Sequence, residues 1–249
     1  MTARSILVEA CVDSVESGMA AEAGGARRLE LCASLVEGGT SPSAGMIAQC
    51  RARVAIPIYV MIRPRGGDFL YSELELEVME RDIHGAKLLG ADGVVFGLLL
   101  QDGRVDIERT MRLIQAARPL DVTFHRAIDV CRDPIEALDA LMTIGVDRVL
   151  TSGQAASALA GSRTIALMVE HARGRLIVLP GGGVNERNAA RVVERTGTGE
   201  IHVRGAARYA SAMTYRSQKV SFRGTPLESD FVLEQTDAAH IRSIVDALK

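Results

Sequence analysis

Short apolar runs recur along the chain, and each is followed by a longer stretch in which apolar residues recur at helical spacing. The runs are continuously apolar, which is typical of strands buried on both faces of a parallel sheet. Eight strand–helix units of this kind predict one domain over residues 1–249 that folds as a closed (β/α)8 TIM-type barrel, with an open doubly wound sheet as the alternative. The predicted strands cover residues 6–12, 28–32, 59–62, 93–99, 122–126, 148–152, 176–179 and 200–203.

Capping residues mark the starts of several predicted helices. Asp13 or Ser14 can cap the first helix, and Pro42 suits the first position of a helix that starts at Ser41. Asn185 is the predicted cap of the helix that follows the seventh strand. Further helices are predicted over residues 73–89, over 106–117, from 133 onward and over 237–248.

One segment departs from the repeat. Residues 207–236 are polar and separate the eighth strand from the last helix, and residues 219–223 within them alternate like an exposed strand. We expect this segment to be an excursion from the repeat that lies beside the mouth of the barrel.

The composition narrows the class of protein. Apolar residues make up 47% of the 249 residues, which is enough for a large core, and the absence of Trp means that aliphatic side chains must fill it. The formal net charge of −2 gives no reason to expect nucleic acid or an acidic membrane surface as a partner. The chain shows no signal-peptide pattern and no apolar run near the ~20 residues of a membrane span, which predicts a cytoplasmic protein with reduced cysteines.

Polar residues gather where the predicted strands end, which is the functional face of a (β/α)8 barrel. Side chains two positions apart on a strand share a face, so Glu9 shares one with Cys11 and Glu30 shares one with Cys32. Each residue alone has an ordinary explanation as a buried ion-pair partner or a small core residue, but the full set predicts a site because buried charge is costly unless it is paired. The set comprises Glu9, Glu30, Arg63, Arg65, Asp68, His125, Arg126, Asp129, Thr151, Ser152 and His202.

The third strand ends in the most distinctive stretch, YVMIRPRGGDFLY at residues 59–71. Pro64 cannot donate to a sheet ladder, so the strand ends near it, and the two glycines that follow allow a tight turn or the close approach of a ligand. Arg63, Arg65 and Asp68 therefore predict a binding site, with an ordinary turn and a surface salt bridge as the alternative.

Two further signals come from later strand ends. His125 is a candidate general base with Asp129 as its orienting partner, or a histidine that is only hydrogen-bonded in place. Residues 181–183 are three glycines at a helix start, and Arg204 follows the eighth strand; these two loops bind phosphate in many barrels. We therefore expect Gly181, Gly182, Gly183, Ser152 and Arg204 to bind an anion, with Arg63 or Arg65 leaning across the mouth, although three glycines can also simply make a tight turn.

Six motifs span most of the chain in order. They are EACVDSVES at 9–17, RLELCASLVEGG at 28–39, VMIRPRGGDFLYS at 60–72, TFHRAID at 123–129, RVLTSG at 148–153 and LPGGGV at 179–184. Together they resemble the CutC family of copper homeostasis proteins, and the resemblance weakens over 207–236. It implies a cytoplasmic (β/α)8 barrel that forms homo-oligomers and handles copper, with Cys11 and Cys32 in the positions proposed as Cu(I) ligands. It gives no role to Cys131, and Cys50 has the helical spacing of a core residue.

Two functions stay open on these observations. Cu(I) binding needs only Cys11 and Cys32, whose soft thiolates on adjacent strands could coordinate the ion nearly linearly. An enzyme acting on a small anionic or polyol substrate, phosphorylated or not, would leave the cysteines incidental, whereas a purely structural role fits poorly with so much charge at one face. The residues of that enzyme would be Glu9, Glu30, Arg63, Asp68, His125 and His202.

Overall fold

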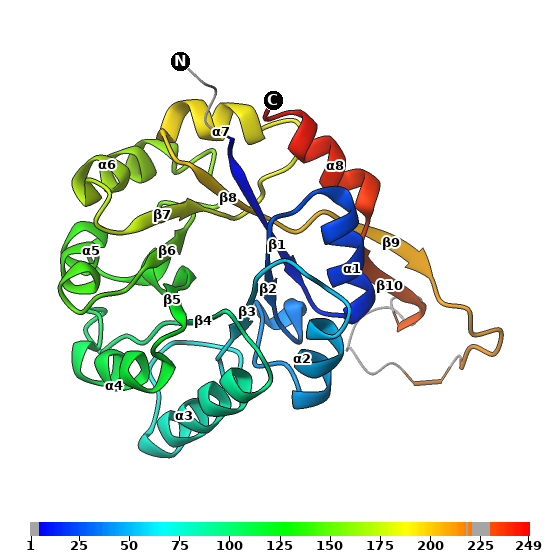
Figure 1. The fold of residues 1–249 in the computed structure, drawn as a ribbon, viewed down its shortest axis with the longest axis horizontal. Coiled ribbons are helices and arrows are strands. Elements are labelled where there is room, and N and C mark those ends of the chain that lie inside the picture. The colour runs from blue at the N-terminus through cyan, green and yellow to red at the C-terminus, as the bar shows by residue number, and fades with distance from the viewer. Residues whose placement is uncertain (1–4, 218, 221–229) are drawn as a thin grey trace.

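The computed structural model describes residues 5–217, 219–220 and 230–249. In this part of the chain, eight parallel strands form one sheet in the order β7-β6-β5-β4-β3-β2-β1-β8, which places the last of them beside the first. Helices surround this sheet, so the predicted (β/α)8 barrel is confirmed (Figure 1). The strands of the sheet are β1 (Leu7–Val12), β2 (Arg28–Leu31), β3 (Ile58–Met61), β4 (Gly93–Phe96), β5 (Asp121–Phe124), β6 (Arg148–Thr151), β7 (Ile177–Pro180) and β8 (Glu200–Val203).

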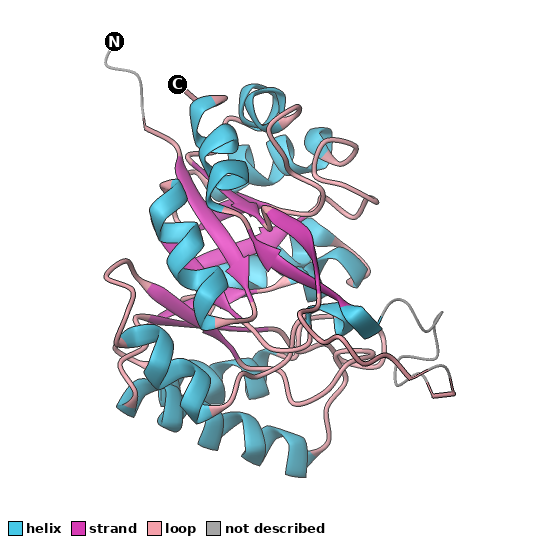
Figure 2. Cartoon of the chain, turned by 90° about the vertical axis from the view of Figure 1, so that its right-hand side faces the viewer, coloured by secondary structure: helices cyan, strands magenta, loops and turns pink. Residues whose placement is uncertain are grey.

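The helices follow their strands as the repeat predicts, and Figure 2 shows the strands enclosed between them. The edge strands β7 and β8 meet where the Thr198 hydroxyl donates to the Val178 carbonyl at 2.7 Å, so the barrel is nearly closed. No helix among the described residues is long and apolar enough to cross a membrane. The α-helices are α1 (Val15–Gly24), α2 (Ala44–Arg51), α3 (Glu73–Leu88), α4 (Ile107–Ala117), α5 (Pro134–Thr143), α6 (Ser162–Ala172), α7 (Ala189–Thr196) and α8 (Ala238–Asp246).

Alternate side chains of each strand point either into the barrel or outward, into the layer between the strands and the helices. On β1, Val8 and Ala10 belong to the large apolar core between the sheet and the helices, whereas Cys11 belongs to a small cluster inside the barrel. Burying the outward side chains supplies most of the apolar stabilisation, at about 25 cal/mol for each Å² removed from water. The positions that face the inside of the barrel are therefore free to hold polar side chains.

Two predicted helix starts are wrong by a few residues. Ser41 does not begin α2, because its amide and hydroxyl both bond to the backbone of Arg63; Ser43 caps the helix instead. Asn185 lies in the turn before α7, where its backbone N–H donates to the side-chain oxygen of Asn188 at 2.9 Å. Asn188 is the cap position. In both cases a tertiary contact or a local turn uses the residue that the pattern favoured.

The polar excursion contains an antiparallel pair of strands, β9 (Ala206–Ala210) and β10 (Val232–Thr236), which extends from the barrel beside α1 (Figure 1). The Thr236 amide donates to the Ser17 hydroxyl at 3.1 Å, which ties this pair to α1. Of the exposed strand predicted over 219–223, residues 219–220 are not in a strand and residues 221–223 lie outside the described residues.

Candidate functional site

A cavity of about 680 Å³ lies at the carboxyl ends of the strands, as the fold class predicts. Met61, Phe69 and His240 also line it and were not predicted; strand parity could have found Met61, which lies two positions before Arg63. The predicted site residues that line the cavity are Cys11, Glu30, Arg63, His125, Arg126, Gly182, Gly183, His202 and Arg204. Those that do not are Glu9, Cys32, Arg65, Asp68, Asp129, Thr151, Ser152 and Gly181.

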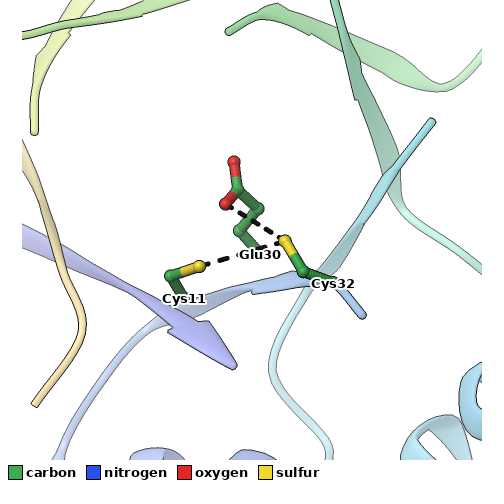
Figure 3. Close-up of side chains that lie close together, drawn as sticks. All are labelled: Cys11, Glu30 and Cys32. Carbon is green, nitrogen blue, oxygen red and sulfur yellow. Dashed lines mark hydrogen bonds between the residues drawn. The ribbon is translucent and has the colours of Figure 1, made fainter. Parts of the chain in front are cut away.

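The two thiols lie close together (Figure 3), with Cys11 on the floor of this cavity and Cys32 fully buried behind it. Cys11 pairs in register with Glu30 across β1 and β2, and Cys32 follows two residues later, so the two side chains are diagonal neighbours on one face. Their sulfurs are 3.9 Å apart, and the Cys32 sulfur lies 3.5 Å from Glu30 Oε2. The proximity predicted from strand parity is confirmed.

Glu9 lies one layer below the thiols and is held by two cations. Arg28 donates to one of its carboxylate oxygens, and His202 Nδ1 lies 2.8 Å from the other. Burial by itself raises the pKa of Glu9, but the charges and hydrogen bonds of Arg28 and His202 outweigh burial and lower the pKa to about 2. Glu9 is therefore ionised, so His202 donates from Nδ1 and its Nε2 faces Glu30.

The groups above Glu9 influence one another strongly. The Nε2 atom of His202 lies 3.9 Å from Glu30 Oε2. Burial lowers the pKa of His202, but Glu30, Cys11 and Glu9 raise it well above its usual range. A hydrogen bond from Cys32 outweighs burial and, with His202, lowers the pKa of Cys11 well below its usual range. Burial and the Cys11 charge raise the pKa of Glu30. The arrangement favours a thiolate at Cys11, and the thiolate is the form that binds metals.

A second layer of charge lies below Glu9, and the sequence analysis missed it. Glu200 accepts from Arg28 at 2.6 Å and from Arg148 at 2.8 Å, so one carboxylate bridges two buried guanidinium groups. Those groups lie 4.9 and 5.3 Å from the centre of the Tyr59 ring, whose hydroxyl donates to Asp121 at 2.5 Å. Arg28 and Glu200 each precede a predicted site residue by two positions on a strand, so parity could have found them.

His125 reaches the cavity from β5, on the far side of the barrel from β1. Its Nδ1 accepts from the Ala127 amide at 3.2 Å, so the neutral ring carries its proton on Nε2. Burial and the Arg63 charge lower the pKa of His125 to about 3. Asp129 does not orient it, so that prediction is wrong: this carboxylate accepts from the Thr151 hydroxyl at 2.6 Å instead.

Arg63 turns toward the backbone rather than across the mouth. It donates to the carbonyls of Glu37, Gly39 and Gly67 at 2.7, 2.9 and 2.8 Å. These three bonds tie the loops after β2 and β3 together. Arg63 is therefore bound to carbonyls that would otherwise be unsatisfied, and its closing on an anion beside β7 and β8 stays a prediction.

Arg65 and Asp68 lie outside the cavity and form the surface salt bridge that was the alternative interpretation of this stretch. Their side chains are 3.1 Å apart and 38% and 73% exposed, and Arg65 also pairs with Glu75 at 2.6 Å. The geometry does not support a catalytic role for Asp68 or a ligand-binding role for Arg65, because neither side chain faces the cavity.

The predicted anion site is only partly assembled. Gly182 and Gly183 line the cavity with φ of +99° and +72°, a backbone conformation that favours glycine. Arg204, however, pairs with Glu234 of β10 at 2.8 Å. The cation that approaches the glycine loop is Arg126, which also donates to Ser152 at 2.9 Å.

Fold and site together define a (β/α)8 barrel with a buried thiol pair, backed by a histidine–carboxylate network, at its mouth. The model of the CutC family matches residues 6–207, and the chain belongs to this family. A human protein named copper homeostasis protein cutC homolog is 49% identical over 242 residues, which cover 97% of this chain and 89% of the human one. A family protein CutC from Parabacteroides distasonis is 46% identical over 96% of this chain and 99% of its own length.

A solved structure agrees with this assignment. The crystal structure of the putative copper homeostasis protein CutC from Streptococcus agalactiae superposes with a TM-score of 0.75 at 34% identity, covering 79% of this chain and 97% of that chain. Thiamine phosphate pyrophosphorylase from Pyrococcus furiosus has a TM-score of 0.57 at 17% identity, which shows a shared fold alone.

Proposed function

We propose that this protein binds Cu(I) through Cys11 and Cys32 on the floor of the barrel mouth, as part of copper handling in the cytoplasm. The observation that carries the proposal is the 3.9 Å separation of the two sulfurs. Two metal–sulfur bonds of about 2.3 Å span at most about 4.6 Å, so one ion can reach both sulfurs without movement of the strands. Soft thiolates select Cu(I), and the human relative is named as a copper homeostasis protein.

The sulfur separation also predicts the shape of the site. With bonds of about 2.3 Å, a separation of 3.9 Å corresponds to a sulfur–metal–sulfur angle of about 116°. The nearly linear coordination expected from the sequence therefore does not fit these side-chain positions. A bent pair leaves room for further donors on the open side of the ion.

The surroundings of the thiols suit a metal that arrives as cargo. Cys11 lines the cavity, which offers a path from solvent, whereas Cys32 is fully buried behind it. A reducing compartment would keep both thiols free, so a cytoplasmic location is part of the proposal. The homo-oligomer implied by the family resemblance is a further part, and sedimentation analysis would test it.

The test is an anaerobic titration of the reduced protein with Cu(I) in competition with a chromophoric chelator. We expect about one Cu(I) per chain, bound by the two thiolates. A Cys11→Ser/Cys32→Ser double variant should lose it. The matched control is Cys50→Ala/Cys131→Ala, which removes the other two buried cysteines and should bind as the wild type does. Equal competition by the wild type and the serine variant would contradict the proposal.

A second candidate function is an enzyme that acts on a small anionic or polyol substrate. Two atoms at the cavity walls favour it: Glu30 Oε1 and His125 Nε2 are buried and have no hydrogen-bond partner among the described residues. Buried polar atoms are rarely left unpaired: a ligand hydroxyl could donate to Glu30 Oε1, and a hydroxyl or anionic oxygen could accept from His125 Nε2.

Thermal unfolding tests this candidate, because a ligand that binds only the folded state raises the melting temperature. Phosphate, sulfate, sugar phosphates and polyols would be compared at matched ionic strength, in the wild type and in His125→Asn. A concentration-dependent rise that His125→Asn abolishes supports the enzyme. The absence of any shift in the wild type argues against it.

A further inference from the structure

Two further metal-binding groups lie beside the thiols, and they come from different strands. Glu30 Oε2 lies 3.5 Å from the Cys32 sulfur and 3.9 Å from His202 Nε2. The ligand atoms of Cys11, Glu30 and Cys32 all lie within 4.8 Å of one another. Two sulfurs and one carboxylate oxygen therefore surround a common space, and Glu30 connects it to His202, which forms a second such group with Glu9 and Glu30.

Two of the distances among these atoms match those of a tetrahedral metal centre. Bonds of about 2.3 Å to sulfur and about 2.0 Å to oxygen or nitrogen, at tetrahedral angles, place two sulfurs about 3.8 Å apart and a sulfur and an oxygen about 3.5 Å apart. The observed separations are 3.9 Å and 3.5 Å. Nitrogen and oxygen would be about 3.3 Å apart, so His202 and Glu30, at 3.9 Å, need to approach only slightly.

We propose that Cys11, Cys32, Glu30 and His202 form a four-coordinate site for a divalent cation of the zinc class. The inference rests on the proposed metal binding by the two thiols and extends it. Cu(I) is satisfied by soft sulfur donors, whereas Zn²⁺ accepts sulfur, nitrogen and oxygen together and prefers four tetrahedral ligands. The bent sulfur pair and the two neighbouring donors therefore suit Zn²⁺ as well as Cu(I).

The surroundings of the two additional donors support the assignment. Glu9 holds Nδ1 of His202 at 2.8 Å, and Arg28 in turn holds Glu9, so the imidazole presents Nε2 to Glu30. A carboxylate that fixes a metal-binding histidine in this way is the usual outer partner in zinc proteins. Independently, Glu30 Oε1 is buried without a hydrogen-bond partner among the described residues, so this carboxylate keeps binding capacity that the protein itself does not use.

The experiment is a pair of anaerobic titrations of the reduced, metal-free protein, one with Zn²⁺ and one with Cu(I), each against a chromophoric chelator. We expect one Zn²⁺ per chain. Glu30→Gln and His202→Asn should each weaken Zn²⁺ binding by more than about 100-fold, and Glu9→Gln by about 10–100-fold, because outer partners contribute that much. Cu(I) binding should change by less than about threefold in all three variants, because both thiolates remain.

Matched controls come from the same cavity. Glu37→Gln and His240→Asn remove the same chemical groups from other parts of the cavity wall and should leave both affinities unchanged. Co²⁺ substitution gives a readout in the unmutated protein: a tetrahedral thiolate site produces intense visible d–d bands and a sulfur-to-metal charge-transfer band, whereas a six-coordinate surface site produces neither.

The outcomes separate this inference from the proposed function. If Cu(I) binds but Zn²⁺ does not, or if Zn²⁺ binding is unaffected by Glu30→Gln and His202→Asn, the four-coordinate site is wrong and the two-thiol Cu(I) site stands. A six-coordinate Co²⁺ spectrum would overturn the four-coordinate site in the same way. If neither metal binds through Cys11 and Cys32, both proposals fail.

Discussion

Two arginine–carboxylate pairs can be compared: Arg28 and Glu9 beneath the thiols, called the floor, and Arg65 and Asp68 outside the cavity, called the rim. The two pairs differ in almost every physical respect. On the floor, the side chains of Arg28 and Glu9 are 4% and 1% exposed, whereas on the rim those of Arg65 and Asp68 are 38% and 73% exposed. Breaking a buried pair leaves an uncompensated charge in a low dielectric, while water and salt screen an exposed pair. The same residue types therefore build a site in one place and a surface contact in the other.

The two regions also differ in what holds them in place. The floor residues stand on neighbouring strands, where the register pairs Cys11 with Glu30 and Glu9 with His202. The rim residues belong to a turn whose contacts are mostly local, such as those of Arg65 with its own loop. Groups fixed on strands keep the geometry that metal binding or catalysis requires, because packing on both faces limits their movement.

The largest effect should come from breaking the floor pair. Arg28→Met keeps much of the side-chain volume but leaves Glu9 and Glu200 short of a buried partner, so we expect a loss of about 3–5 kcal/mol in the free energy of unfolding, measured in urea. The double variant Arg28→Met/Glu9→Gln should recover part of it. A loss below about 1 kcal/mol would show that the floor behaves like the rim.

Lowering the pH should lower the free energy of unfolding, because His125 is buried in the folded protein. The pKa of His125 is about 3 in the folded protein and about 6.5 when unfolded, so the unfolded state binds more protons between these values. The contribution of His125 is fully present above pH ~6.5 and is lost by up to about 1.4 kcal/mol per pH unit as the pH falls toward ~3. Urea unfolding from pH 4 to 7 should show a shallower dependence in His125→Asn, which can still accept from the Ala127 amide. Parallel curves would contradict the assignment.

Removing a buried hydroxyl group should lower the free energy of unfolding by less than breaking the buried ion pair does. Tyr59→Phe removes the donor to Asp121 inside the barrel and should cost about 1–3 kcal/mol. The matched control is Tyr209→Phe on β9, whose hydroxyl donates to Asp237 at 2.9 Å in an exposed position. That change should cost little, because water replaces the lost bond. Equal losses in the two variants would remove the distinction that burial makes.

The smallest effect is expected on the rim. Arg65→Met should change the free energy of unfolding by about 0–1 kcal/mol, and the difference should shrink as salt is added. Its Cu(I) affinity should equal that of the wild type, because Arg65 does not line the cavity. A loss of metal binding in this variant would return the stretch after β3 to the functional site.

Local patterns determined the architecture and part of the floor. Continuous apolar runs separated by helical periodicity predicted the (β/α)8 barrel, and alternation along a strand placed Cys11 with Glu9 and Cys32 with Glu30. These inferences succeed because strand parity and helix periodicity are properties of the backbone over a few residues. The same parity also reaches Arg28 and Glu200, which lie one layer deeper on the same strands.

Only the tertiary structure decided which groups meet. The 3.9 Å between the sulfurs and the contact of His202 with Glu9 depend on register between strands that are distant in the chain. Arg63, which is expected to close on a ligand, donates to three backbone carbonyls. A long polar side chain takes whichever buried partners the finished fold leaves unsatisfied, and no local pattern records where those partners lie.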